Sequence, residues 1–170
     1  VRENVRIALQ RARGNSYDFW RSERVLRELD PHADELIDAV GLRGFERTSA
    51  GELPYGRKRA LEIATTLALE PEMMLLDEPT AGMAHEDVGR ITALIRRVAA
   101  NRTVLMVEHN LSVVSTLSDR ITVLARGEIL AEGSPAEMST LVASADGEIA
   151  RALGAGPALA CRIGALAVTD

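Results

Sequence analysis

Residues 73–80 read Met73-Met74-Leu75-Leu76-Asp77-Glu78-Pro79-Thr80, and this stretch decides the fold. Four consecutive apolar residues are typical of a buried strand, and the proline prevents the strand from continuing. In an α/β sheet, ligands bind outside the carboxyl ends of the strands. Asp77 and Glu78 are therefore candidates for handling a metal and a nucleotide. The alternative is a strand that ends in an ordinary polar loop.

A second candidate strand, residues 103–107, follows a stretch with helical periodicity. Apolar residues recur on one face of residues 86–98, and residues 103–107 are continuously apolar, as parallel strands covered on both sides tend to be. Strand, helix and strand in this order predict a βαβ unit with parallel neighbouring strands. His109 should then emerge with Glu108 near Asp77 and Glu78. For His109 alone, the alternative is a hydrogen-bonded strand end without a chemical role.

The chain before residue 70 is predicted to be helical. Apolar residues recur at helical spacing within residues 1–29, on both sides of a loop at 13–16. Asp30 and Pro31 are predicted to cap and open a helix that stops at Gly41. A polar connector then leads to another helix over residues 57–69.

Three cations, Arg57, Lys58 and Arg59, crowd the first turn of that helix. Cations in this position oppose the helix dipole, so helix stability does not explain them. One interpretation is an anion site, in which the backbone amides around Gly56 and the positive helix start face a phosphate. The other interpretation is a solvated charged turn.

The last third of the chain contains shorter elements. Residues 121–125 and 128–131 are predicted to form a strand pair joined by a tight turn. Ser134 to Glu137 combine a capping box with a proline at the first helical position, which predicts a final helix. Beyond residue 154, glycines and a proline break any helix, and we expect a mobile tail.

The composition restricts the class of protein. The 170 residues are 46% hydrophobic and 26% charged, as in ordinary globular proteins. A net charge of -5 argues against a nucleic-acid surface, which would show a basic excess. The single cysteine, Cys161, fits a reducing compartment. No apolar run reaches the roughly 18–20 residues that span a bilayer.

The motifs in this order resemble the nucleotide-binding subunit of ABC transporters. Residues 73–78 resemble the Walker B segment, residues 81–84 occupy the D-loop position, and His109 is placed as the switch histidine. Residues 53–57 align with the family's signature LSGGQ. The resemblance covers residues 1–153 and is specific because these motifs occur together in the right order and spacing.

The resemblance implies an α/β fold, namely a partial P-loop NTPase (ABC ATPase) fold with a parallel sheet core and a helical subdomain. It assigns residues 1–70 to the helical signature subdomain, 71–153 to the C-terminal part of the RecA-like core, and 154–170 to a disordered tail. A P-loop needs Gly-Lys followed by Ser or Thr, but the one lysine, Lys58, precedes Arg59. We expect a C-terminal fragment that lacks the P-loop and hydrolyses ATP poorly alone.

Several positions depart from the family pattern. Pro54 replaces the signature serine, Arg57 replaces the signature glutamine, and Ala84 replaces the D-loop aspartate. Because Pro54 has neither a hydroxyl nor an N–H, phosphate contacts must come from neighbouring backbone amides and the helix start. These departures resemble the subfamily that powers branched-chain amino-acid uptake.

The resemblance also implies ATP and Mg²⁺ as cofactors and gives individual residues their roles. Asp77 would help to hold Mg²⁺ through water, Glu78 would be the general base, and His109 would sense the γ-phosphate. The nucleotide-binding residues implied are Leu53, Tyr55, Gly56 and Arg57, which would serve the ATP of a second subunit, and Ala81 and Gly82 in the D-loop.

The implied partners are a second ABC ATPase subunit and membrane permease subunits, with neither nucleic acid nor direct membrane insertion. The implied location is cytoplasmic, on the inner face of the cell membrane through the permease. Two alternatives stay open: a non-catalytic module that pairs with an intact ABC ATPase, and an ABC ATPase for another substrate. Chromosome-maintenance ATPases share these motifs, but their long coiled coil before the signature has no counterpart here.

Overall fold

The structure, a computed structural model, describes residues 1–14, 26–125, 128–144 and 158–163. The chain divides into two compact units, Val1–Pro71 and Glu72–Asp170, and each is described by itself. The division falls one residue beyond the boundary expected from the sequence, between residues 70 and 71.

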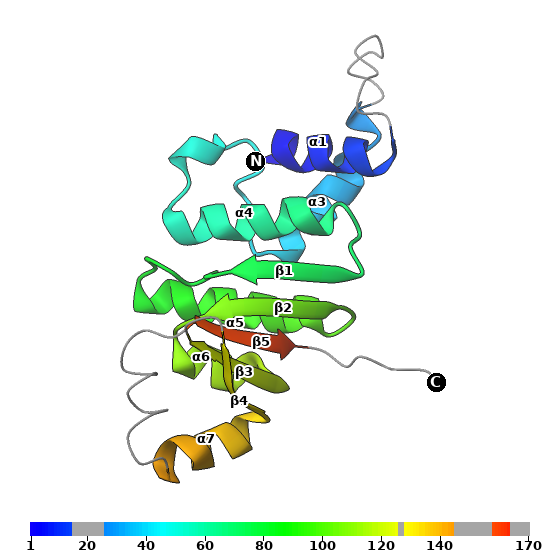
Figure 1. Cartoon of the computed structure of the whole chain (residues 1–170). Helices are drawn as coiled ribbons and strands as arrows, with labels where there is room; N and C mark the ends of the chain where they lie inside the picture. Colours follow the sequence, from blue (N-terminus) through cyan, green and yellow to red (C-terminus); the bar gives the residue numbers. More distant parts are fainter. Residues whose placement is uncertain (15–25, 126–127, 145–157, 164–170) are drawn as a thin grey trace. The chain divides into compact units, whose positions relative to one another are not determined.

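The first unit is helical in its described residues. It contains α1 (Arg2–Ala12), α3 (Asp30–Ala39), the short 3₁₀ helix η1 (Ala50–Glu52) and α4 (Tyr55–Leu67) (Figure 1). The helices α1, α3 and α4 contact one another in pairs. Their apolar stripes meet in a core, as the helical spacing predicts. Fully buried members of this core are Val5, Ala33, Ile37, Leu42 and Ala64.

The start of α3 differs from the expectation. Asp30 is the first residue of the helix rather than its cap, and no side chain caps the helix. The Asp30 carboxylate accepts a hydrogen bond from Arg6 of α1, and Asp34 accepts two from Arg2, at 2.7 and 2.9 Å. Ion pairing between α1 and α3 therefore determines where the Asp30 side chain lies. Gly41, at a φ of 75°, ends the helix region as predicted.

The second unit contains a five-stranded sheet in the order β1-β2-β5-β3-β4. The strands are β1 (Met73–Asp77), β2 (Thr103–Glu108), β3 (Arg120–Ala125), β4 (Glu128–Gly133) and β5 (Ala158–Ile163). The pair β1 and β2 is parallel, with Met73 opposite Thr103 and Asp77 opposite Val107. The predicted parallel pair and the predicted β3–β4 pair are both confirmed.

Burial of β1 and β2 is less complete than the sequence suggests. In β1 only Met74 is buried, whereas Leu75 is 72% exposed. In β2, buried Val104, Met106 and Glu108 alternate with half-buried residues. The expectation of strands covered on both faces was wrong for the described residues, because β1 is an edge strand and only one face of β2 is closely packed.

Strand β5 differs from the expectation of a disordered tail over residues 154–170. Residues Ala158–Ile163 lie between β2 and β3 and pair antiparallel with both (Figure 1). It follows that β2 and β3 run parallel to each other with one strand position between them. A strand in that position satisfies backbone groups on two neighbours at once, which alanine-rich sequence alone does not reveal.

The helices of the second unit are α5 (His85–Ala99), α6 (Leu111–Leu117) and α7 (Pro135–Ser144). The apolar face of α5 is buried through Ile91, Leu94, Ile95 and Val98, as predicted. The predicted capping box is present, because the Ser134 amide donates to Glu137 Oε2 and the Glu137 amide donates to Ser134 Oγ. None of the described helices is both long and apolar enough to cross a membrane.

Candidate nucleotide and metal site

The parallel pairing of β1 and β2 brings their polar carboxyl ends together. Asp77 is the last residue of β1 and lies opposite Val107, so that Glu78 follows beside Glu108. The Glu78 amide donates a hydrogen bond to the Val107 carbonyl at 2.8 Å, which extends the strand pairing by one residue. The strand ends thus form one site, as the βαβ pattern predicts.

Glu78 adopts a backbone conformation that is unusual for a residue with a side chain. Its φ is 42°, in the left-handed region. Such a conformation costs about 1–3 kcal/mol and persists only where the surroundings enforce it. Here the turn after Glu78 is closed by a hydrogen bond from the Ala81 amide to the Glu78 carbonyl at 3.1 Å. Strain at a strand end that carries a carboxylate is typical of functional sites.

The Glu78 carboxylate and the His109 imidazole face each other. Glu78 Oε1 lies 3.3 Å from His109 Nδ1, and both side chains are about half exposed. The pair therefore stays accessible to water and to a ligand. A carboxylate held beside an imidazole, in contact with solvent, is an arrangement suited to accepting a proton from a water molecule.

Asp77, Ala81 and Gly82 are neighbours of Glu78 in the chain, and among the described residues their side chains form no hydrogen bond with Glu78 or His109. Asp77 is exposed, and among the described residues its carboxylate has no hydrogen bond or ion pair with the protein. Ala81 and Gly82 form the turn that follows Thr80, and Gly82 has a φ of 70°, which glycine adopts without strain. The structure therefore groups Glu78 with His109 and leaves the Asp77 carboxylate free.

Glu108 and Thr80 are the residues at this site that the sequence analysis did not assign a role. Glu108 is 1% exposed, and its Oε2 accepts a hydrogen bond of 2.7 Å from the Thr80 hydroxyl. The sequence held no signal for this role, because residues 103–107 are continuously apolar and only the structure shows that Glu108 lies on the buried face of β2 with Val104 and Met106.

The second set of predicted residues, 53–57, lies in the first unit at the start of α4. Pro54 precedes the helix, and Leu53 and Gly56 are buried while Tyr55 is half exposed. Helix α4 begins at Tyr55, two residues earlier than expected. Within the described part of the chain, the Tyr55 and Gly56 amides donate to no protein acceptor, so two backbone donors remain for an anion at this helix start.

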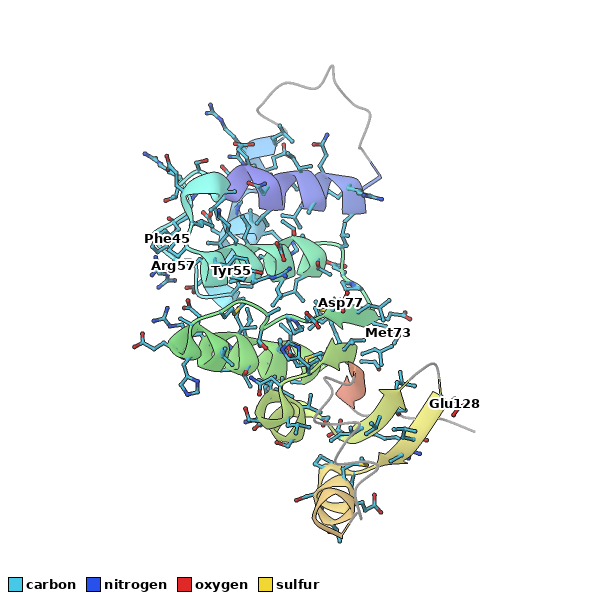
Figure 2. All side chains as sticks on the ribbon, turned by 60° about the vertical axis from the view of Figure 1, so that its left-hand side comes forward. Phe45, Tyr55, Arg57, Met73, Asp77 and Glu128 are labelled. Carbon is cyan, nitrogen blue, oxygen red and sulfur yellow. The ribbon has the colours of Figure 1, made fainter. Side chains whose placement is uncertain are left out.

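Two of the cations in this turn, Arg57 and Arg59, have partners of their own. The Arg57 guanidinium lies 4.0 Å from the centre of the Phe45 ring, and Figure 2 shows this pair at the start of α4 beside Tyr55. Arg59 donates to Glu62 at 2.7 Å, and this hydrogen bond raises the pKa of the Arg59 guanidinium. Stacking holds Arg57 next to the free amides without neutralising its charge, which favours the anion-site interpretation.

Comparisons with known proteins agree with this geometry. Residues 1–81 match the family model described as ABC transporter. Among solved structures, the ATP-binding cassette MJ1267 of an ABC transporter, in its ADP conformation, aligns with 90% of this chain and 62% of its own, at a TM-score of 0.69 and 26% identity. The fold is that of an ABC ATPase cassette.

Curated proteins similar to this chain are also recognisable by sequence. The high-affinity branched-chain amino acid transport ATP-binding protein BraF of Pseudomonas aeruginosa is 38% identical over 71% of this chain and 47% of its own length. The energy-coupling factor transporter ATP-binding protein EcfA of Methanothermobacter thermautotrophicus is 36% identical over 65% of this chain and 36% of its own. The chain spans about half the length or less of these relatives.

The described residues at the carboxyl ends of β1 and β2 offer few protein ligands for a magnesium ion. No cluster of three or more potential ligands occurs among the described residues, and Asp77 is one free, exposed carboxylate. Mg²⁺ prefers oxygen ligands and usually keeps several waters, so one carboxylate beside a phosphate-bearing ligand is sufficient. Asp77 is thus the residue of this site that is suited to Mg²⁺.

Proposed function

We propose that the chain serves as the ATP-binding and ATP-hydrolysing subunit of an ABC importer for branched-chain amino acids. The observation that carries the hydrolytic part is the pairing of Glu78 with His109, at 3.3 Å across two parallel strand ends. The name of the Pseudomonas aeruginosa relative supports the substrate class. The similarity to EcfA supports the competing assignment, in which the transporter carries another substrate.

In this proposal Glu78 is the general base. Its carboxylate accepts the proton of the attacking water, and the neighbouring imidazole of His109 holds that water and contacts the γ-phosphate. Asp77 would hold Mg²⁺ through water, and the ion supplies positive charge against the phosphate oxygens when bound. The turn that enforces the strained backbone of Glu78 keeps the base in place before the nucleotide arrives.

The start of α4 has the complementary role. The free amides of Tyr55 and Gly56, with Leu53 and Arg57 beside them, would contact the phosphates of ATP held by a second subunit. Ala81 and Gly82 would lie at the same interface. Assembly with a second ATPase subunit and with permease subunits would place the chain on the cytoplasmic side of the cell membrane.

The hydrolytic part is tested in a chimera. The part of the Pseudomonas aeruginosa relative that precedes its matched segment is joined to this chain, and ATP binding and turnover are measured. Glu78→Gln should bind ATP normally and lose about 10²–10⁴-fold in turnover, the usual contribution of a general base. Glu70→Gln is the matched control, because Glu70 is also exposed and has a positive φ of 50°. Unaltered turnover in Glu78→Gln removes Glu78 from the base role.

The substrate and the non-catalytic alternative have separate tests. Leucine uptake by vesicles that contain the relative's permease and the chimera supports branched-chain substrates, whereas hydrolysis without uptake rejects them. Calorimetry of the 170-residue chain with Mg-ATP addresses the alternative, a module that only pairs with an intact ATPase. Nucleotide binding seen only when an intact ABC ATPase subunit is added would favour that alternative.

A further inference from the structure

Glu108, the last residue of β2, is a buried carboxylate with no assigned role. It is 1% exposed, and its side chain is completely covered. Carboxylates are seldom buried in this way unless hydrogen bonds or charges compensate for the lost water. Among the described residues no lysine or arginine forms an ion pair with it, and Nδ1 of His109 lies 3.5 Å from Glu108 Oε1.

Hydrogen bonds provide the compensation. Glu108 Oε2 accepts from the Thr80 hydroxyl at 2.7 Å and from the Thr80 amide at 3.3 Å. Glu108 Oε1 accepts from the amides of His109 and Asn110, both at 3.1 Å. Each oxygen therefore has two donors, and all of these bonds are strengthened by the carboxylate charge.

These bonds join the two loops that carry the reactive pair. Thr80 follows Glu78 by two residues in the turn after β1, and His109 and Asn110 follow β2. Oε2 of Glu108 binds the loop after β1, and Oε1 binds the loop after β2. The Met83 amide also donates to the Thr80 carbonyl at 3.3 Å, so the bonds to Thr80 secure the whole turn in which Glu78 has its strained φ of 42°.

We propose that Glu108 is a positioning residue for ATP hydrolysis, which fixes the Glu78 carboxylate against the His109 imidazole by clamping Thr80 to the end of β2. The proposal rests on the proposed function, in which Glu78 and His109 act on the attacking water. Glu108 itself is buried, and its side chain is not accessible to solvent. Without the clamp, the turn relaxes its strain and the two exposed side chains separate.

The test is made by NMR on the 170-residue chain, without nucleotide. It measures the NOE between the His109 ring protons and the Glu78 side-chain protons, together with hydrogen exchange of the Thr80, His109 and Asn110 amides. The variants are Glu108→Gln, Thr80→Val and Thr80→Ser. The control is Thr92→Val, which removes a hydroxyl that donates to the Val88 carbonyl at 2.8 Å in α5.

The clamp predicts a specific pattern. Thr80→Val and Glu108→Gln should lose most of the NOE between Glu78 and His109. In both variants the backbone amide of residue 80 should exchange roughly tenfold faster or more than in the wild type. Thr80→Ser, which keeps the hydroxyl, should restore both signals, and Thr92→Val should leave them unchanged. If Glu108→Gln does not fold, the Val and Ser variants of Thr80 decide the outcome.

Two results overturn the clamp: an NOE of wild-type strength in folded Thr80→Val, or no NOE in the wild-type chain. If Thr92→Val also loses the NOE and the amide protection, the effect of the Thr80 and Glu108 variants is a general loss of structure, and the positioning role is rejected. None of these measurements involves ATP. Failure of the clamp is therefore distinct from failure of the proposed function, which the turnover of Glu78→Gln decides.

Discussion

The left-handed backbone of Glu78 makes a prediction about stability that is independent of any ligand. At residue 78, Glu78→Gly and Glu78→Ala remove the same carboxylate, and they differ in the Cβ atom that makes a φ of 42° costly. The left-handed conformation costs an alanine about 1–2 kcal/mol. The greater freedom of glycine in the unfolded chain costs about 0.5–1 kcal/mol. The glycine variant should therefore be the more stable by about 0.75 kcal/mol, the difference between the two midpoints, and by about 1.5 kcal/mol at most.

The assay is urea and thermal unfolding of both variants. A difference of 1 kcal/mol corresponds to roughly 4–8 °C in Tm for a unit of this size. The same order, glycine above alanine, is expected at Glu70, where φ is 50°. Glu62, inside α4, provides the opposite control, because alanine there should exceed glycine by about 1 kcal/mol. An alanine variant at residue 78 that is more stable than the glycine variant would refute the reasoning.

Three further predictions concern packing, capping and pH. Met106→Ala should lower the free energy of unfolding by about 2–5 kcal/mol, because Met106 is fully buried. Leu75→Ala should change it by less than about 0.5 kcal/mol, because Leu75 is 72% exposed. Asn110→Ala should cost about 1 kcal/mol, and Asn110→Asp should not, because Asn110 Oδ1 caps α6 by accepting from two amides; equal losses would contradict this. The hydrogen bond from Arg6 lowers the pKa of Asp30, so this pair stabilises above pH of about 4 and its contribution disappears as the pH falls further. Urea titrations of wild type and Arg6→Gln should therefore differ at pH 7 and converge towards pH 2, and a constant difference would contradict the linkage.

Local sequence was sufficient for most of the elements. The apolar face of α5, the glycine that ends α3 and the capping box of α7 depend on neighbours within a few residues, so periodicity and capping rules predict them. The parallel pairing of β1 and β2 followed from the strand, helix, strand order. The proximity of Glu78 and His109 followed in turn from that pairing.

Interactions between distant residues were the ones that sequence rules missed. Asp30 matches an N-cap rule, yet its carboxylate pairs with Arg6, 24 positions away. Residues 158–163 lack any strand signal, yet they occupy the position between β2 and β3. In both cases the deciding partner lies outside the window from which a local preference is read.

Residues 73–80 show the same division. The sequence alone determined that a strand ends in two carboxylates and a proline, because apolar runs and proline act locally. Only the tertiary structure decided that Glu78 is strained and that buried Glu108 holds Thr80 across 28 positions. The reason is physical: a buried carboxylate must find its donors wherever the fold brings them, and the pairing of β1 with β2 brings Thr80 from the turn that follows the neighbouring strand.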